Sequence, residues 1–156
     1  MNTWHMFFTG MADFTSIKSK DRSTKVGAVI VGEDNEVLSI GYNGFPRGVD
    51  DTIDERHNRP DKYEFTEHAE RNAIYNAARQ GIRLKDSTMY LNWEPIPCPD
   101  CTRAIIQAGI KRVVGPNIEF PNNSTMDWHE RFKHSISMLE EAGIEIVTIE
   151  ENEIEQ

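Results

Sequence analysis

The two cysteines of this 156-residue chain stand three positions apart, in the segment PCPDC at residues 97–101. On the first turn of a helix, residues i and i+3 lie on the same face, so both thiols can reach one metal ion or form one redox pair. Pro99 suits an early helical position, and the positive end of the helix dipole lowers the pKa of a nearby thiol. By themselves, the two cysteines therefore indicate a zinc site or a dithiol redox centre with equal weight.

A histidine and a glutamate upstream favour zinc. His68 and Glu70 belong to the triplet HAE, at the start of another predicted helix. Three protein ligands, His68, Cys98 and Cys101, leave the fourth tetrahedral position to water, which is the pattern of a catalytic zinc site. Glu70 is close enough to take a proton from that water and to pass it to a leaving nitrogen. The other histidines lack ligand spacing and are expected at the surface or in capping positions; they are His5, His57, His129 and His134.

An α/β domain is expected to position these residues. Apolar residues recur at helical spacing from Trp4 to Phe14, and the β-branched run VGAVIV at 26–31 is typical of a buried strand. The sequence predicts helices over residues 3–19, 67–81, 98–110 and 127–142, and strands over residues 26–31, 37–41, 87–93, 111–115 and 144–149. The first two strands form a hairpin, and three helix–strand repeats follow. This order predicts a mixed five-stranded sheet with helices on both faces, a three-layer sandwich. Residues 1–149 would form one domain and residues 150–156 an acidic tail.

Composition narrows the classes of partner. The net charge is −9, so no basic footprint for a large nucleic acid is present. No apolar run approaches the roughly 18 residues of a membrane span, and no secretory signal is evident. Two cysteines without an export signal indicate a cytoplasmic location. The basic stretch KSKDRSTK at 18–25 has two interpretations, a site for one small anion or a solvated helix end.

The polar stretch 42–66 is too long for a passive connection and is expected to be a functional loop or flap. It begins within GYNGFP at 41–46, where glycines allow close backbone approach and Asn43 offers both a donor and an acceptor. Tyr42 or Phe45 can pack on a base or a sugar. The segment thus fits a loop that binds a nucleotide, although a tight turn after the second strand would use similar residues.

The combination HAE…PCPDC resembles the signature of the zinc nucleobase deaminases. The chain is similar to the cytidine and deoxycytidylate deaminase superfamily, and within it to the deoxycytidylate deaminases over residues 3–148. Three further stretches carry this likeness: SKDRSTKVGAVIV at 19–31, GYNGFPRG at 41–48 and AIIQAGIKRVV at 104–114. The resemblance disfavours the redox interpretation of the cysteine pair.

The resemblance implies hydrolysis of dCMP to dUMP and ammonia in pyrimidine deoxynucleotide biosynthesis, with one zinc ion and Glu70 as the proton carrier. It implies that Asn43 contacts the sugar and that backbone groups near Ala69 and Pro97 hold the pyrimidine. The candidate phosphate ligands are Lys25, Lys20, Arg22 and Arg47. It also implies a homo-oligomer, a hexamer or a dimer, regulated by dCTP and dTTP. The candidate effector-binding residues are Gly41, Tyr42, Asn43, Gly44 and Arg47.

Other functions remain open. The substrate could instead be CMP, dCTP, a modified dCMP or a tRNA adenosine, although the acidic balance and GYNGFP disfavour tRNA. A non-catalytic protein that binds zinc or a nucleotide is the alternative from another class. Arg71 follows Glu70 where an apolar residue is common in the family, and is either an extra anion contact or a solvated helix residue. Residues 49–67 contain only His57 as a possible soft ligand, so a second zinc is not expected.

Overall fold

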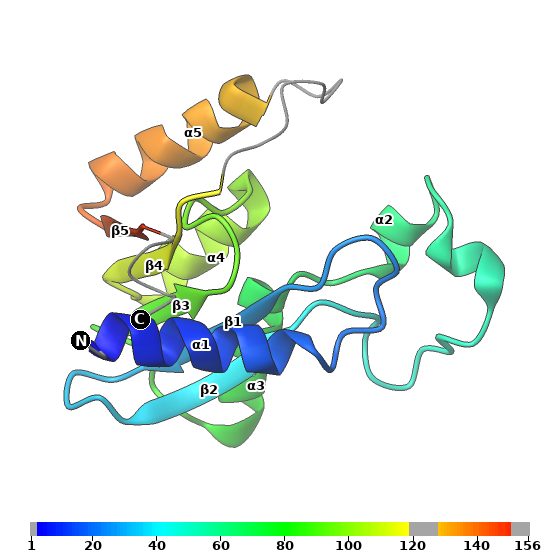
Figure 1. The fold of residues 1–156 in the computed structure, drawn as a ribbon, viewed down its shortest axis with the longest axis horizontal. Coiled ribbons are helices and arrows are strands. Elements are labelled where there is room, and N and C mark those ends of the chain that lie inside the picture. The colour runs from blue at the N-terminus through cyan, green and yellow to red at the C-terminus, as the bar shows by residue number, and fades with distance from the viewer. Residues whose placement is uncertain (1–2, 119–127, 151–156) are drawn as a thin grey trace.

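The computed structural model describes residues 3–118 and 128–150. Five strands form one sheet in the order β2-β1-β3-β4-β5 (Figure 1). The strands are β1 (Gly27–Val31), β2 (Val37–Tyr42), β3 (Thr88–Leu91), β4 (Arg112–Pro116) and β5 (Glu145–Ile149). The helices are α1 (Trp4–Ser16), the 3-10 helix η1 (Asp54–His57), α2 (Lys62–Phe65), α3 (Ala69–Gln80), α4 (Pro99–Ala108) and α5 (Trp128–Glu141). The expected elements are all present, with ends that shift by at most three residues.

The sheet is mixed, as the sequence predicts. β1 pairs antiparallel with β2 on one side and with β3 on the other. β3, β4 and β5 are parallel to one another. α4 connects β3 to β4 and α5 connects β4 to β5, and each helix carries the chain back to the end of the sheet at which the preceding strand began. Residues 119–127 and 151–156, which include most of the predicted acidic tail, lie outside the described residues.

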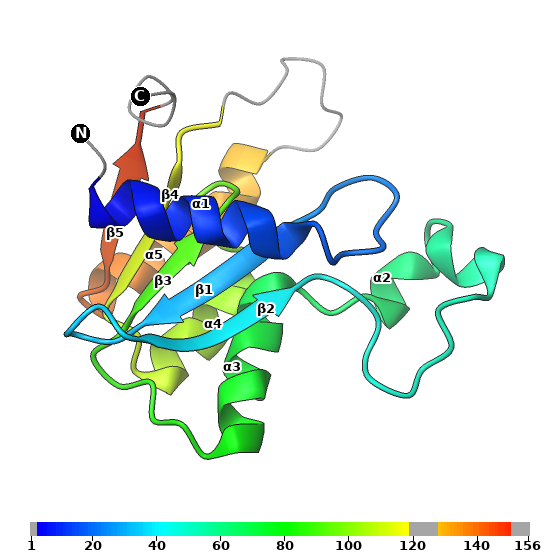
Figure 2. The ribbon, with the colours of Figure 1, turned by 60° about the horizontal axis from the view of Figure 1, so that its bottom comes forward.

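Helices cover both faces of the sheet (Figure 2). α1 lies across one face, and α3, α4 and α5 lie on the other. β1 is buried along its whole length, because alternate residues face the two layers. Ala28 and Ile30 belong to the core beneath α3 and α4, whereas Val29 and Val31 pack with Phe8 of α1. The predicted three-layer sandwich is therefore confirmed.

A close approach between β2 and α3 depends on Gly41. A Cβ built on this glycine would lie 2.3 Å from the backbone nitrogen of Ala73 and 2.6 Å from the carbonyl oxygen of Ala69. The Ser39 hydroxyl adds a hydrogen bond of 2.7 Å to the Ala73 carbonyl oxygen. This part of the sheet is thus fixed against the first two turns of α3.

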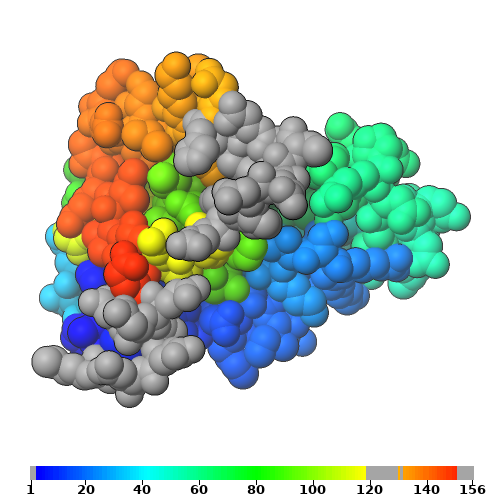
Figure 3. All heavy atoms as spheres, turned by 45° about the horizontal axis from the view of Figure 1, so that its top comes forward, coloured from blue at the N-terminus to red at the C-terminus, as the bar shows by residue number. Residues whose placement is uncertain are grey.

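The stretch 42–66 contains η1 and α2 and projects from the sheet as a lobe (Figures 1 and 2). Aromatic rings hold the lobe together: Phe45 stacks on His57, with centroids 4.7 Å apart, and packs against Phe65. The space-filling view shows the lobe beside the segment that follows α1 (Figure 3). Within the described parts of the chain, no helix has the length and apolar character needed to cross a membrane.

Candidate active site

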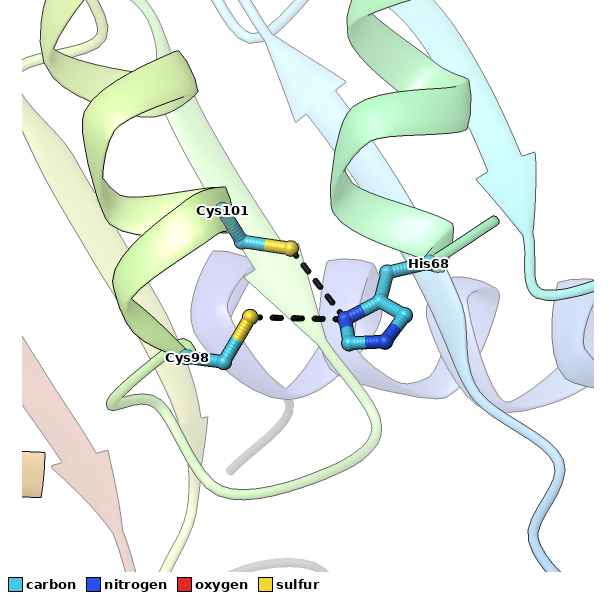
Figure 4. A group of neighbouring side chains, drawn as sticks. All are labelled: His68, Cys98 and Cys101. Atoms are coloured by element: carbon cyan, nitrogen blue, oxygen red, sulfur yellow. Dashed lines mark hydrogen bonds between the residues drawn. The ribbon is translucent and has the colours of Figure 1, made fainter. Parts of the chain in front are cut away.

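Two helix N-termini bring the predicted metal ligands together (Figure 4). His68 is the N-cap residue of α3, and its carbonyl oxygen accepts a hydrogen bond from the Asn72 amide. Cys98 is the N-cap residue of α4, Pro99 is the first helical residue, and Cys101 lies buried on the same turn. The predicted local structure is confirmed, with His68 and Cys98 as caps rather than as first-turn residues.

The three side chains have the spacing of a zinc site. The Nδ1 atom of His68 lies 3.5 Å from the Sγ atom of Cys98 and 3.4 Å from that of Cys101, and all three ligand atoms lie within 4.8 Å of one another. A tetrahedral zinc, with Zn–S of about 2.3 Å and Zn–N of about 2.0–2.1 Å, separates sulfur from nitrogen by about 3.5–3.6 Å. The donor set therefore fits one metal ion. No second group of this kind occurs among residues 3–118 and 128–150.

The electrostatics of the ligands also suit a cation. The pKa of Cys98 is lowered to about 4, because the Cys101 thiol donates a hydrogen bond to it and His68 adds a second. The same hydrogen bond, together with burial, raises the pKa of Cys101, and the contact with Cys98 raises that of His68. Without a metal ion, Cys98 is thus the thiolate, and Cys101 and His68 donate hydrogen bonds to it. A metal ion that binds there displaces the protons of these two donors.

Glu70 is buried in the first turn of α3, next to this cluster. Burial raises the pKa of its carboxyl group, and the charge of His68 opposes that rise. A carboxyl group with a raised pKa is suited to accept a proton and then release it near neutral pH.

Arg71 links the two helices that carry the ligands. Its Nε atom donates to Glu67 Oε1 at 2.6 Å, and its Nη1 atom lies 3.7 Å from Asp100 Oδ2 on α4. The same Glu67 oxygen accepts a hydrogen bond of 3.0 Å from the His68 amide. Arg71 is therefore ion-paired between α3 and α4 and is not a solvated helix residue, whereas its role as an extra anion contact stays a prediction. Sequence reasoning missed Glu67 and Asp100, although Glu67 stands at the i, i+4 spacing of a helical ion pair with Arg71.

The GYNG segment is joined directly to HAE. Gly44 and Glu67 exchange two backbone hydrogen bonds, of 3.0 and 2.9 Å. The Asn72 side chain of α3 donates a further bond of 2.8 Å to the carbonyl oxygen of Tyr42. These bonds hold the expected nucleotide-binding segment against Glu67, the residue that precedes His68.

Asn43 is buried and holds the chain that enters β1. Its Oδ1 atom accepts from the Val26 amide at 2.9 Å, and its Nδ2 atom donates to the Thr24 carbonyl oxygen at 2.9 Å. One amide hydrogen and one lone pair are not used in these two bonds.

A pocket of about 140 Å³ lies between the segment after α1 and the lobe. It is lined by Lys18, Lys20, Asp21, Arg22, Tyr42, Phe45, Asp51, His57, Lys62 and Thr66. Of the predicted nucleotide-binding residues, this pocket contains Lys20, Arg22, Tyr42 and Phe45. Lys62, His57 and Thr66 were not predicted, and no pattern in the sequence singles them out.

Carboxylates partly neutralise the cations of this pocket. Lys20 pairs with Asp51 at 2.6 Å, and Arg22 pairs with Asp54 at 2.5 Å. Lys62 pairs with the half-buried Asp21 at 3.1 Å. Burial alone would raise the pKa of Asp21, but hydrogen bonds from the backbone amides of residues 23 and 24 and from Lys62 lower it overall.

The remaining predicted binding residues lie elsewhere. Arg47 donates a hydrogen bond of 2.6 Å to Asn76 on α3. Lys25 is exposed outside the pocket lining. Ala69 and Pro97 are buried, and the Pro97 carbonyl oxygen accepts a hydrogen bond of 3.3 Å from Thr102.

The three-layer fold, the three ligands and the adjacent glutamate define the class of zinc-dependent deaminases, which are hydrolases. The chain belongs to the cytidine and deoxycytidylate deaminase zinc-binding family, whose model matches residues 2–115.

Curated relatives are similar over much of the chain. An uncharacterized deaminase of Aliivibrio fischeri is 38% identical over 146 residues, which cover 94% of this chain and 93% of that protein. The deoxycytidylate deaminase of Homo sapiens is 40% identical over 116 residues, which cover 71% of this chain and 63% of the human protein. The match thus spans less than two thirds of the human relative.

Solved structures agree on the fold. The dCMP deaminase of cyanophage S-TIM5, in complex with dCMP and dUMP, superposes with a TM-score of 0.71 at 27% identity. The match covers 92% of this chain and 94% of the phage protein. A tRNA:A34 deaminase, at 20% identity and a TM-score of 0.57, shares the fold.

Proposed function

We propose that this chain hydrolyses dCMP to dUMP and ammonia. The observation that carries the proposal is the convergence of His68, Cys98 and Cys101 beside the buried Glu70. The choice of dCMP rests on the relatives: the human protein is named a deoxycytidylate deaminase, and the phage structure contains dCMP and dUMP. The reaction supplies dUMP to pyrimidine deoxynucleotide biosynthesis.

The proton steps fall to Glu70. Zinc, when held by the three ligands, makes water acidic enough to act as a nucleophile at neutral pH. Glu70 accepts a proton from the attacking water and donates it to N3 of the cytosine ring. It then takes the second proton of that water, from the hydroxyl group now bonded to C4, and delivers it to the departing amine. The C4–N4 bond breaks, so that water and dCMP give dUMP and ammonia. The raised pKa of Glu70 supports this role, because the carboxyl group must hold the proton between the two transfers.

The base is held beside the helix N-termini. Ala69 is the first residue of α3 and follows His68 directly, and Pro97 directly precedes Cys98, the N-cap of α4. We assign the edge of the pyrimidine to these groups. The amide hydrogen and lone pair of Asn43 that remain unused in its two bonds are assigned to the deoxyribose.

The pocket beside the lobe supports a site for the phosphates of a nucleotide. It combines Lys18, Lys20, Arg22 and Lys62 with the rings of Tyr42 and Phe45. Cations suit phosphate oxygens, and aromatic faces suit a base or a sugar. Thr66 of its lining is two residues from His68. We assign the effectors dCTP and dTTP to this pocket and to the adjoining segment 41–44. Arg47 is kept as a candidate contact, although its guanidinium donates a hydrogen bond to Asn76 on α3.

The test is ammonia release from a panel of substrates: dCMP, CMP, dCTP, deoxycytidine and adenosine-containing tRNA, each with and without added dCTP or dTTP. Turnover of dCMP, with turnover altered by the triphosphates, is expected. Turnover of CMP or dCTP in place of dCMP would keep the zinc chemistry and overturn the substrate. Absence of turnover across the panel by zinc-loaded protein would overturn the enzymatic function.

A further inference from the structure

Each polar atom of Asn43 is bonded to the segment that leads into β1. Its side chain bonds to Thr24 and Val26, and its backbone amide donates to the Val26 carbonyl oxygen at 3.2 Å. Its own carbonyl oxygen accepts a hydrogen bond of 2.8 Å from the hydroxyl of Ser19, which is buried. The orientation of Asn43 therefore depends on the conformation of residues 19–26.

Asp21 fixes that conformation. Its Oδ1 atom accepts hydrogen bonds from the backbone amides of Ser23, at 2.8 Å, and Thr24, at 3.0 Å. Its own amide donates to the Ser19 hydroxyl oxygen at 3.2 Å. An aspartate that accepts from amides two and three positions further along stabilises a turn. Because the Thr24 carbonyl oxygen accepts from Asn43 Nδ2, a change in the turn at 21–24 moves a partner of Asn43.

Lys62 of the lobe holds the carboxylate of this turn in place. Its Nζ atom lies 3.2 Å from Asp21 Oδ1 and 3.1 Å from Asp21 Oδ2. The side chain of Lys62 is 13% exposed and that of Asp21 is 7% exposed. A buried carboxylate that loses its counter-ion moves toward water or takes up a proton. Either response weakens the hydrogen bonds that it accepts from the turn, since bonds to an ionised acceptor are the stronger ones.

Two other ion pairs join the segment after α1 to the lobe, but they are more exposed (Figure 3). The side chain of Lys20, which pairs with Asp51, is 71% exposed, and that of Arg22, which pairs with Asp54, is 57% exposed. Water and salt screen such pairs, so each contributes little. Neither Asp51 nor Asp54 belongs to the turn at 21–24. The pair of Lys62 with Asp21 is thus the one that connects the lobe to the partners of Asn43.

We propose that Lys62 is a positioning residue for the reaction, which sets the orientation of Asn43 through Asp21 and the turn at 21–24. The inference rests on the proposed function, which assigns Asn43 to the deoxyribose of the substrate. The zinc ligands are held separately, at the N-termini of α3 and α4. Loss of the Lys62 contact therefore affects the grip on the sugar more than the proton transfers at the base.

Steady-state kinetics of the zinc-loaded full chain with dCMP test the proposal. Lys62→Met is expected to raise KM by about 10-fold and to change kcat by less than about 3-fold, because a binding contact is weakened rather than a proton transfer. Lys111→Met breaks an exposed ion pair with Glu33 of 2.8 Å and is the matched control, with KM unchanged. Circular dichroism and zinc content show that each variant is folded. A folded Lys62→Met variant with the KM of the unmodified chain would overturn the proposal.

A double variant separates the charge of Lys62 from its packing. In Lys62→Met combined with Asp21→Asn, the asparagine keeps an oxygen that accepts from the turn amides and needs no counter-ion. KM is expected to return to within about 3-fold of the value for the unmodified chain, because no unpaired charge is left in the turn. A KM that stays at the value of the single Lys62→Met variant would show that Lys62 only packs the lobe, and would overturn the proposal.

The route through Asn43 is tested in an Asn43→Ala background. There, Lys62→Met should raise KM no further, because the side chain that it positions is already gone and the two effects are not additive. A second rise of about 10-fold in that background would mean that Lys62 acts independently of Asn43, against the proposal.

Hydrogen exchange distinguishes failure of this inference from failure of the proposed function. The amides of Thr24 and Val26 donate to Asp21 and Asn43, so Lys62→Met should speed their exchange by at least about 10-fold, whereas Lys111→Met should not. This measurement needs no turnover. Absence of dCMP hydrolysis by the unmodified chain would overturn the proposed function, whereas unchanged exchange in folded Lys62→Met would overturn the link through Asp21.

Discussion

Gly41→Ala tests how β2 positions the active site. The added Cβ would lie 2.3 Å from the Ala73 nitrogen, whereas ordinary contact begins at 3.4 Å. Both nearest neighbours are backbone atoms of α3, so rotation of a side chain cannot relieve the overlap. Helix and strand must separate by about 1 Å, which moves His68 and Glu70 relative to α4.

We expect two effects of this separation. The free energy of unfolding falls by about 1–3 kcal/mol, as is usual for an overpacked contact. Turnover falls by up to about 10²-fold, because a 1 Å displacement of catalytic groups can cost that much. Urea unfolding and steady-state ammonia release measure the two quantities.

Gly32→Ala is the matched control. The three atoms nearest to the Cβ of that variant belong to the end of the Glu36 side chain, which can move, so a change within about 0.5 kcal/mol is expected. A Gly41→Ala protein with unchanged stability and turnover would show that β2 does not set the position of α3.

Three further variants follow from the site. Glu70→Gln should retain zinc and the fold but lose about 10²–10⁴-fold in turnover, because the variant removes the group that transfers protons. Metal analysis and ammonia release measure the two quantities, and full activity of the variant would refute the role of Glu70. The lowered pKa of Asp21 contributes stability that is present above its ordinary pKa of 3.8 and is lost as the pH falls through the lowered value. Urea unfolding between pH 6 and pH 3 should therefore show a shallower loss of stability for Asp21→Asn than for the unmodified chain; equal slopes would refute it. Arg71→Met should weaken zinc affinity by about 10–100-fold, as removal of groups that orient metal ligands does. Arg103→Met is the control, because exposed Arg103 also pairs with Asp100, and it should leave zinc affinity unchanged. Competition with a chelator measures the zinc affinity of both variants.

The metal ligands were predictable from the sequence because each of them belongs to a short local motif. His68 and the cysteine pair each stand at a helix N-terminus whose start the sequence marks, and the HAE and PCPDC motifs match a known signature. The five strands were predictable from their β-branched runs and intervening helices. Periodicity alone does not predict the antiparallel pairing of β1 with β3, since this pairing depends on contacts between strands that are distant in sequence.

The pocket was less predictable because distant ion pairs build it. Lys62 reaches the pocket through its contact with Asp21, and His57 through its stacking on Phe45. Neither contact has a local sequence pattern. Conversely, Lys25 belongs to the same basic stretch as Lys20 but lies outside the pocket, so charge along the chain was a poor guide to position. Its role as a phosphate ligand stays a prediction.

Zinc titration of the metal-free protein tests most directly whether the His68, Cys98 and Cys101 site carries the activity. Turnover of dCMP is expected to be absent without zinc, to rise in proportion to added zinc and to stop rising at one zinc per chain. The double variant Cys98→Ser, Cys101→Ser should remain inactive throughout the titration. Full turnover in the metal-free protein, or turnover restored by zinc in that double variant, would contradict the central claim.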